Sequence, residues 1–228
     1  MIEFTNVSVG GFKQNLSLRI EDGRVCKIVI GSRYEQRMLL DVMLGFNRPE
    51  SGSIIIGQTD VYAGDPMRDA HRRAAVAWSD GGLISNLSVW ENLTLPLWYH
   101  IGDARRGAAA NPDNPVEKIA GIFQAMDMDA WEFFEKHFDR LPGFLPPHLK
   151  TLFGIVRAML MEPEVIIYDS AFESFSPAMA AKIVQAARAF HSERRERVSL
   201  YLTTDANSAK ELSPDIVVEL KEKGFSTI

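Results

Sequence analysis

Two short, mostly apolar runs, one near each end of the chain, constrain the fold more than any other feature of the sequence. Val25–Ile30 ends just before a glycine, and Val165–Asp169 ends in an aspartate. Runs of this length, bounded by turn residues, are typical of strands that are buried on both faces of a parallel sheet. Helical patterns alternate with the strand patterns, so the sequence predicts an α/β fold with a largely parallel sheet.

The middle of the chain differs in kind, because its apolar residues recur at helical spacing. Two stripes mark such helix faces: Val116, Ile119, Phe123 and Met126, and then Leu149, Leu152, Phe153, Val156, Met159 and Leu160. We therefore predict an α/β core formed by residues 1–86 and 162–228, with residues 87–161 inserted between them as a helical subdomain.

Composition excludes several classes of protein. The 228 residues carry a net charge of −5, which argues against a broadly basic, nucleic-acid-binding protein. A single cysteine rules out an internal disulfide and a cysteine metal site, and we predict no metal site. No apolar run reaches the roughly 18 residues that a membrane span needs. We expect a cytoplasmic chain that reaches a membrane only through a partner.

Several motifs, in their order and spacing, resemble the nucleotide-binding domain of ABC transporters. Residues 28–31 and 39–46 resemble the strand and the helix on either side of the family's phosphate loop, and residues 48–57, R-P-E-S-G-S-I-I-I-G, resemble its P-x-S-G-x-I-x-I-x-G hairpin. Residues 87–93 resemble L-T-V-x-E-N, and residues 157–163 resemble R-A-L-x-x-x-P. The resemblance covers nearly the whole chain. It implies a RecA-like P-loop NTPase core with an antiparallel β edge and an inserted helical subdomain.

The phosphate loop departs from the family pattern G-x-x-G-x-G-K-[ST]. Residues 31–38 read G-S-R-Y-E-Q-R-M, one residue short before a helix that we expect from Leu39. Interior glycines let backbone N–H groups close around phosphate. Here only the first glycine of the motif, Gly31, remains. Arg33 and Arg37 could hold an anion, although solvated loop charges are the simpler interpretation.

The resemblance also assigns the nucleotide-binding positions. The essential lysine falls at Gln36 or Arg37, the Mg²⁺-binding hydroxyl at Met38, and the Walker B aspartate at Asp169, with Gly31 as the first glycine. These replacements predict either no binding or weak binding of ATP and Mg²⁺. An aspartate at the end of a strand is as often a helix cap as a metal ligand, so Asp169 by itself decides little.

The positions that the resemblance assigns to catalysis are also altered. Ser170 stands where the family has the glutamate that polarises the attacking water, and a serine cannot act as that base at neutral pH. Thr204 stands at the switch histidine, and Ser79 stands at the glutamine of the Q-loop. No intact catalytic residue is therefore predicted.

The signature loop, L-S-G-G-Q in the family, falls on residues 144–148. In an ABC dimer this loop faces the γ-phosphate held by the partner's phosphate loop. Leu145 has no hydroxyl, and Pro146 and Pro147 have no N–H to donate. Because proline is well tolerated at a helix start, we predict a helix that begins at these prolines without the ligand chemistry.

Three hypotheses remain open for the function. The first is an active ABC ATPase with atypical motifs that energises transport. The second, which we favour, is a largely non-catalytic ABC-type subunit that pairs as a homodimer or a heterodimer. The third is an unrelated P-loop-like α/β protein, but the helical insert matches the family beyond the phosphate loop. Both halves of a composite ABC site are altered here, which favours the second.

The resemblance implies a partner and a location as well. Residues 168–177 are similar to a stretch of the ATPase subunits of MCE-type lipid transporters, and residues 92–97 resemble both these subunits and the lipoprotein-releasing class. This suggests a platform on the cytoplasmic side of the inner membrane, bound to an integral membrane transporter subunit, in a system for lipid or other hydrophobic substrates. Trp78, Trp90 and Trp98 fall within one short segment, and because tryptophan is enriched at interfaces we predict that they dock this partner.

Overall fold

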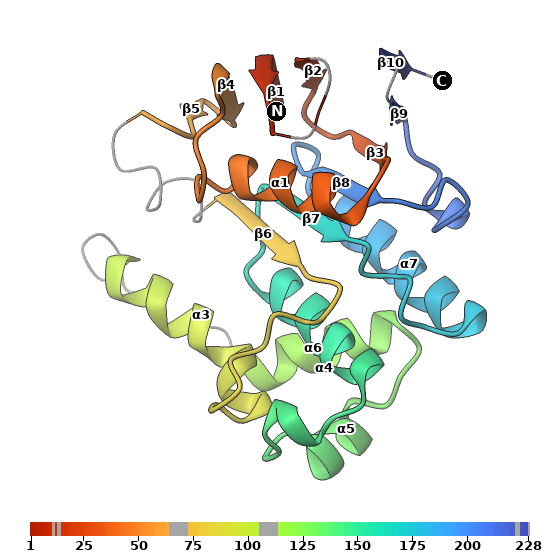
Figure 1. Ribbon diagram of the computed structural model, residues 1–228. Coiled ribbons are helices and arrows are strands. Elements are labelled where there is room, and N and C mark those ends of the chain that lie inside the picture. The colour runs from red at the N-terminus through yellow and green to blue at the C-terminus, as the bar shows by residue number, and fades with distance from the viewer. Residues whose placement is uncertain (11, 13–14, 64–72, 105–113, 222–223, 228) are drawn as a thin grey trace.

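A computed structural model describes residues 1–10, 12, 15–63, 73–104, 114–221 and 224–227 (Figure 1). Its larger sheet has the strand order β10–β9–β3–β8–β7–β6. The strands are β3 (Val25–Ile30), β6 (Ala74–Ala77), β7 (Val165–Asp169), β8 (Val198–Thr203), β9 (Ile216–Lys221) and β10 (Gly224–Thr227). All neighbours pair in parallel except β10, which runs antiparallel to β9. The two apolar runs thus lie in one sheet, as predicted, with β8 between them.

The smaller sheet is antiparallel and has the order β2–β1–β4–β5. Its strands are β1 (Ile2–Ser8), β2 (Leu16–Ile20), β4 (Ser51–Ile56) and β5 (Thr59–Asp60). One apolar core joins this sheet to α1 (Arg33–Met43) and to the inner strands of the larger sheet. This sheet is the predicted antiparallel β edge.

Helices form the rest of the molecule. They are α3 (Val89–Ala104), α4 (Pro115–Ala125), α5 (Ala130–His137), α6 (Pro147–Leu160) and α7 (Pro177–Ser192), with short 3₁₀ turns η1 (Pro142–Phe144) and η2 (Lys210–Leu212). Helices α3 to α6 gather at the end of the molecule opposite the antiparallel sheet (Figure 1). The second predicted stripe lies wholly in the core that these helices share, and the first does so through Ile119, Phe123 and Met126, while Val116 is only half-buried and lies outside that core. The residue boundaries of the helical subdomain stay a prediction.

The start of α1 differs from the sequence-based expectation. The helix begins at Arg33 and not at Leu39, so residues 33–38 are helical. Ser32 is the N-cap: its side chain accepts a hydrogen bond from the backbone N–H of Glu35 and donates one to the Glu35 carboxylate. This reciprocal capping extends the helix into the stretch where the family has its phosphate loop. At the other end of α1, Gly45 has a φ of 74°, which is typical of a glycine that ends a helix.

Candidate functional site

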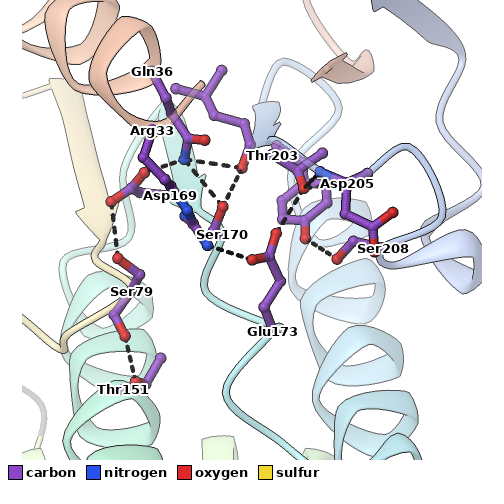
Figure 2. A network of polar contacts seen from close by, with 12 residues as sticks. Arg33, Gln36, Ser79, Thr151, Asp169, Ser170, Glu173, Thr203, Asp205 and Ser208 are labelled. Carbon is purple, nitrogen blue, oxygen red and sulfur yellow. Dashed lines mark hydrogen bonds and ion pairs between the residues drawn. The ribbon is translucent and has the colours of Figure 1, made fainter. Parts of the chain in front are cut away.

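The polar site lies where three parallel strands end. The carboxyl ends of β3, β7 and β8 meet at one edge of the sheet, and the first turns of α1 follow directly from β3. This placement brings together side chains of α1 with those at the end of β7 and in the segment after it (Figure 2). Such crevices beyond the carboxyl ends of strands are where open α/β sheets bind ligands.

Gln36 occupies the centre of this site. Its side chain is 1% exposed, and its Nε2 donates hydrogen bonds to Oδ1 of Asp169 and, at 3.1 Å, to Oγ of Ser170. The structure therefore brings together two of the predicted nucleotide-binding residues, Gln36 and Asp169. The amide nitrogen of Gln36 bonds to the carboxylate of Asp169 across the site, while Oε1 of Gln36 is buried without a hydrogen-bond partner among the described residues. The amide stands at a position that the resemblance gave to the phosphate-binding lysine.

The second oxygen of Asp169 faces another element. Oδ2 of Asp169 accepts from the hydroxyl of Ser79 at 3.4 Å, and the backbone carbonyl of Ser79 accepts from Oγ1 of Thr151 at 2.8 Å. Thr151 belongs to α6, so a continuous chain of polar contacts runs from α1 through β7 to the helical region (Figure 2). We name this chain, Gln36–Asp169–Ser79–Thr151, the polar relay.

A second set of contacts closes the other side of the site. The guanidinium of Arg33 forms an ion pair with Glu173, whose other oxygen accepts from Oγ1 of Thr203 at 2.7 Å. Oγ1 of Thr203 in turn accepts from the backbone N–H of Asp205 at 2.9 Å. The sequence pointed to neither Glu173 nor Thr203, because no local pattern links residues that lie so far apart along the chain.

Arg37 and Met38 take no part in the contacts around Gln36 and Asp169, although Arg37 lines the neighbouring cavity. Both Arg33 and Arg37 are exposed, as expected for solvated charges, but they lie on a helix and not on a loop. Arg37 pairs with Asp41 at 2.9 Å, and its guanidinium lies 4.9 Å from the centre of the Trp78 ring. Met38 packs against the core that joins the two sheets. Its side chain thus serves packing at the position where the family has its Mg²⁺-binding hydroxyl.

The two predicted catalytic positions have different surroundings. Ser170 is buried, has a φ of 49°, and donates its backbone N–H to the carbonyl of Leu202 at 2.9 Å. Its hydroxyl faces Gln36, as described above. Thr204 is half-buried just after β8, and its neighbour Thr203, not Thr204, joins the network. A serine hydroxyl at this position cannot act as a general base at neutral pH.

The signature-loop residues serve folding. Leu145 is only 5% exposed and belongs to the core of the helical region. Pro146 is the N-cap of α6 without a side-chain cap hydrogen bond, and Pro147 is its first residue, as the sequence predicts. Neither proline has an N–H, so the helix start offers fewer donors to an anion than an ordinary one does. Beside them, Phe144 is 75% exposed.

A depression lies between residues of the α/β core and residues of the helical region. We call it the apolar groove. It has a volume of about 410 Å³ and is lined by Leu44, Phe46, Ala74, Ala75, Val76, Trp78, Leu95, Pro96, Arg157, Ala158 and Met161. Phe46 and Leu95 are both exposed at its rim. Burial lowers the pKa of Arg157, whose Nη2 donates to the carbonyl of Gly81 at 3.2 Å.

The three predicted docking tryptophans have separate positions. Trp78 is half-buried and lines the apolar groove. Trp90 is half-buried too, but its ring packs against Phe134 and Phe138 in the helical core. Trp98 lies outside the residues whose side chains the structure describes. Of the two tryptophans whose side chains the structure describes, Trp78 lines the apolar groove and Trp90 does not.

The described residues of the polar site offer few groups that could bind a Mg²⁺–nucleotide. The cavity beside the relay has a volume of about 210 Å³ and is lined by Arg33, Gln36, Arg37, Trp78, Ser79, Asp80 and Asp169. Gln36 holds the carboxylate that would face the metal, and helix α1 replaces the loop whose N–H groups would cradle phosphate. Within the described residues, no group of three or more His, Cys, Asp or Glu side chains could hold a metal ion. The residues present do not fit the group.

Comparisons with known sequences find distant relatives. No protein-family model matches the sequence. The chain is 26% identical over 218 residues to the methionine import ATP-binding protein MetN of Rhizobium meliloti (strain 1021), a match over 93% of this chain and 57% of that protein. It is 25% identical over 174 residues to the probable ribonucleotide transport ATP-binding protein mkl of Mycobacterium tuberculosis (strain ATCC 25618 / H37Rv), over 75% of this chain and 45% of that protein. The chain spans about half the length of these curated relatives.

Solved structures that match this fold are also ATP-binding cassettes. The ATP-binding cassette MJ0796, in a dimeric post-hydrolysis state bound to ADP and Pi, matches with a TM-score of 0.79 and 18% identity. The match covers 99% of this chain and 98% of that one, and it shows the fold. None of the helices in the described part of the chain has the length and hydropathy of a membrane span. The structural matches show that the chain has the fold of an ABC ATP-binding cassette, and the sequence matches show that its homologues are ATP-binding subunits of ABC transporters.

Proposed function

We propose that this chain is an ABC-type subunit that does not hydrolyse ATP and acts as a cytoplasmic platform for a membrane transporter. One observation carries the proposal: the amide of Gln36 is hydrogen-bonded to Asp169 inside the site. A protein side chain thereby takes the position of the ligand. Displacing it would leave a buried carboxylate without its donor, which is costly because buried polar groups need partners.

The proposal that this chain does not hydrolyse ATP rests on three separate differences from the family pattern. Helix α1 replaces the phosphate loop, Ser170 replaces the general base, and Pro146 and Pro147 remove donors from the signature position. Phosphoryl transfer depends almost entirely on positioning and on electrostatic stabilisation by such groups. Losing all three removes most of what the fold contributes to catalysis.

The platform role is supported by the apolar groove. Exposed apolar side chains that line a depression mark interaction sites in soluble proteins more often than isolated ones do. Phe46 lines the groove from the α/β core and Leu95 lines it from α3. A helix of a partner that entered the groove would therefore contact both the core and the helical region. We propose that an integral membrane subunit supplies that helix, which would hold this chain at the inner membrane.

Partner and cargo follow from the same resemblance. The solved cassettes of this fold include dimers, so we propose that the chain pairs with itself or with a second cassette subunit. A lipid or another hydrophobic cargo is supported by residues 168–177 and 92–97, where the sequence resembles the MCE-type class.

Membrane association tests the platform. Phe46→Asp and Leu95→Asp each place a charge on the rim of the groove, and each should move the chain from the membrane fraction to the soluble fraction. Phe144→Asp is the matched control, because Phe144 is equally apolar and more exposed but does not line the groove. Retention of both groove variants on the membrane, or release of the control to the same extent, would contradict docking at this groove.

A further inference from the structure

Trp78 lies between the polar site and the apolar groove. It lines both the cavity beside Asp169 and the groove that contains Phe46 and Leu95. One side of its ring is covered by the guanidinium of Arg37, at 4.9 Å. Any displacement of the polar site would therefore shift a wall of the groove, because close-packed side chains transmit movement to their neighbours.

The segment after Trp78 is held tightly against α6. Oγ1 of Thr151 donates to the carbonyl of Ser79, and Nη2 of Arg157 donates to the carbonyl of Gly81. Gly81 has a φ of 83°, and a Cβ atom there would lie 2.1 Å from the carbonyl oxygen of Lys150. The backbone of residues 78–82 thus fits α6 in one arrangement, and it carries Trp78 with it.

The other end of this segment is tied to α1 through the polar relay. Ser79 contacts Asp169, and Asp169 accepts from Gln36, which is buried in α1. Every link in this path is a side chain or backbone group of the chain itself. In a site that binds a ligand, contacts of this kind are made to the ligand, but here each one joins two groups of the chain itself.

We infer that the polar relay is a built-in lock, which holds the apolar groove in its docking shape without any nucleotide. The inference rests on the proposed function and extends it, because it says why a silent cassette can still bind a partner. A ligand can shift a conformational equilibrium only if it binds the two states differently. In this chain the side chain of Gln36 takes the part of such a ligand and stabilises one conformation. The groove therefore has its docking shape as soon as the chain folds.

Hydrogen exchange of the intact chain tests the lock. Gln36→Ala removes the amide and should speed backbone exchange in residues 79–97 and 147–153 by about five-fold, the factor that corresponds to one net hydrogen bond. Tyr34→Ala is the matched control on the same turn of α1. Its side chain is 67% exposed, and its exchange should equal that of the wild type.

A second variant covers the case in which Gln36→Ala fails to fold. Thr151→Val keeps the shape of a fully buried side chain and removes only the hydroxyl that donates to Ser79. It should speed exchange in residues 79–82 and at the start of α6 and leave β7 unchanged. Unchanged exchange in Thr151→Val, or in a folded Gln36→Ala, would overturn the lock.

Adding Mg-ATP to the wild-type chain separates this inference from the proposed function. We expect no change in exchange. A change in exchange on adding ATP would contradict a groove that is set without nucleotide, and unaffected variants would likewise contradict the lock. Steady phosphate release by the wild-type chain would instead contradict catalytic silence, whatever the variants do.

Discussion

The side-chain amide of Gln36 donates a hydrogen bond to the carboxylate of Asp169, and this contact ties the first turn of α1 to the end of β7. Both residues are buried, and they lie far apart in the sequence. In the resemblance to ABC cassettes each stands at a position that faces nucleotide or metal. Here they face one another, so residues of a binding site have become part of the fold's own hydrogen-bonding network.

Gln36→Ala should therefore destabilise the fold. The substitution leaves Asp169 without its buried donor, and we expect the free energy of unfolding to fall by about 1–3 kcal/mol. Urea denaturation measures the loss. Tyr34→Ala, on the exposed side of the same helix, should change it by no more than about 0.5 kcal/mol. An equal effect of the two variants would mean that the contact with Asp169 contributes nothing specific.

Gln36→Lys should not restore nucleotide binding, although it returns the family's residue type. The new ammonium would pair with Asp169, and helix α1 would still replace the phosphate loop, whose N–H groups are needed for phosphate. Calorimetry with Mg-ATP is the measurement, and Tyr34→Lys controls for the added charge. Micromolar binding by Gln36→Lys alone would show that a single side chain, and not the loop, sets the affinity.

Leu145→Ser should also fail to rebuild the signature loop, and it should damage the core. Leu145 is 5% exposed among the apolar residues of the helical region, so its truncation should lower the free energy of unfolding by about 2–5 kcal/mol. Phe144→Ser, one residue earlier and 75% exposed, should be close to neutral. Thermal denaturation of both variants decides. A neutral Leu145→Ser would contradict its role in packing.

Much of the fold could be predicted because burial leaves a clear pattern in the sequence. The apolar runs became β3 and β7, the two helical stripes except Val116 became a shared core, and the prolines at residues 146 and 147 began α6. Each of these signals is local and strong. The alignment of the motifs then gave the order of the elements.

The site was harder to predict for physical reasons. A signal for the early start of α1 was present: Ser32 and Glu35 have the spacing of a capping box, which marks a helix start. The contacts of Arg33 with Glu173, and of Glu173 with Thr203, join residues that are distant in sequence. No spacing rule connects such residues, so only the three-dimensional structure reveals them.

Acid should weaken the fold through His191. Nδ1 of its ring lies 2.9 Å from Oγ of Ser199, and Nε2 lies 3.3 Å from the carbonyl oxygen of Gly23. Burial lowers the pKa of His191 below its ordinary value of 6.5, with nearby Arg197 lowering it further and Asp215 opposing. The unfolded chain therefore takes up a proton at a higher pH than the folded chain does. Stability should be constant above about pH 7 and should decline as the pH falls through about 6.

Urea denaturation at about pH 7.5 and about pH 5 measures this decline. His191→Gln removes the titrating ring and should reduce the difference between the two values. The remainder should include His137, whose pKa burial also lowers. An equally large decline in His191→Gln would show that other groups are responsible.

Isothermal titration calorimetry of the wild-type chain with Mg-ATP, followed by an assay of phosphate release, tests the central claim most directly. We predict no binding up to about 1 mM ATP and no turnover above the buffer control, because Gln36 already holds Asp169 and no general base follows it. Micromolar affinity with steady turnover, both abolished by Asp169→Asn, would contradict the account and identify the chain as an active ATPase.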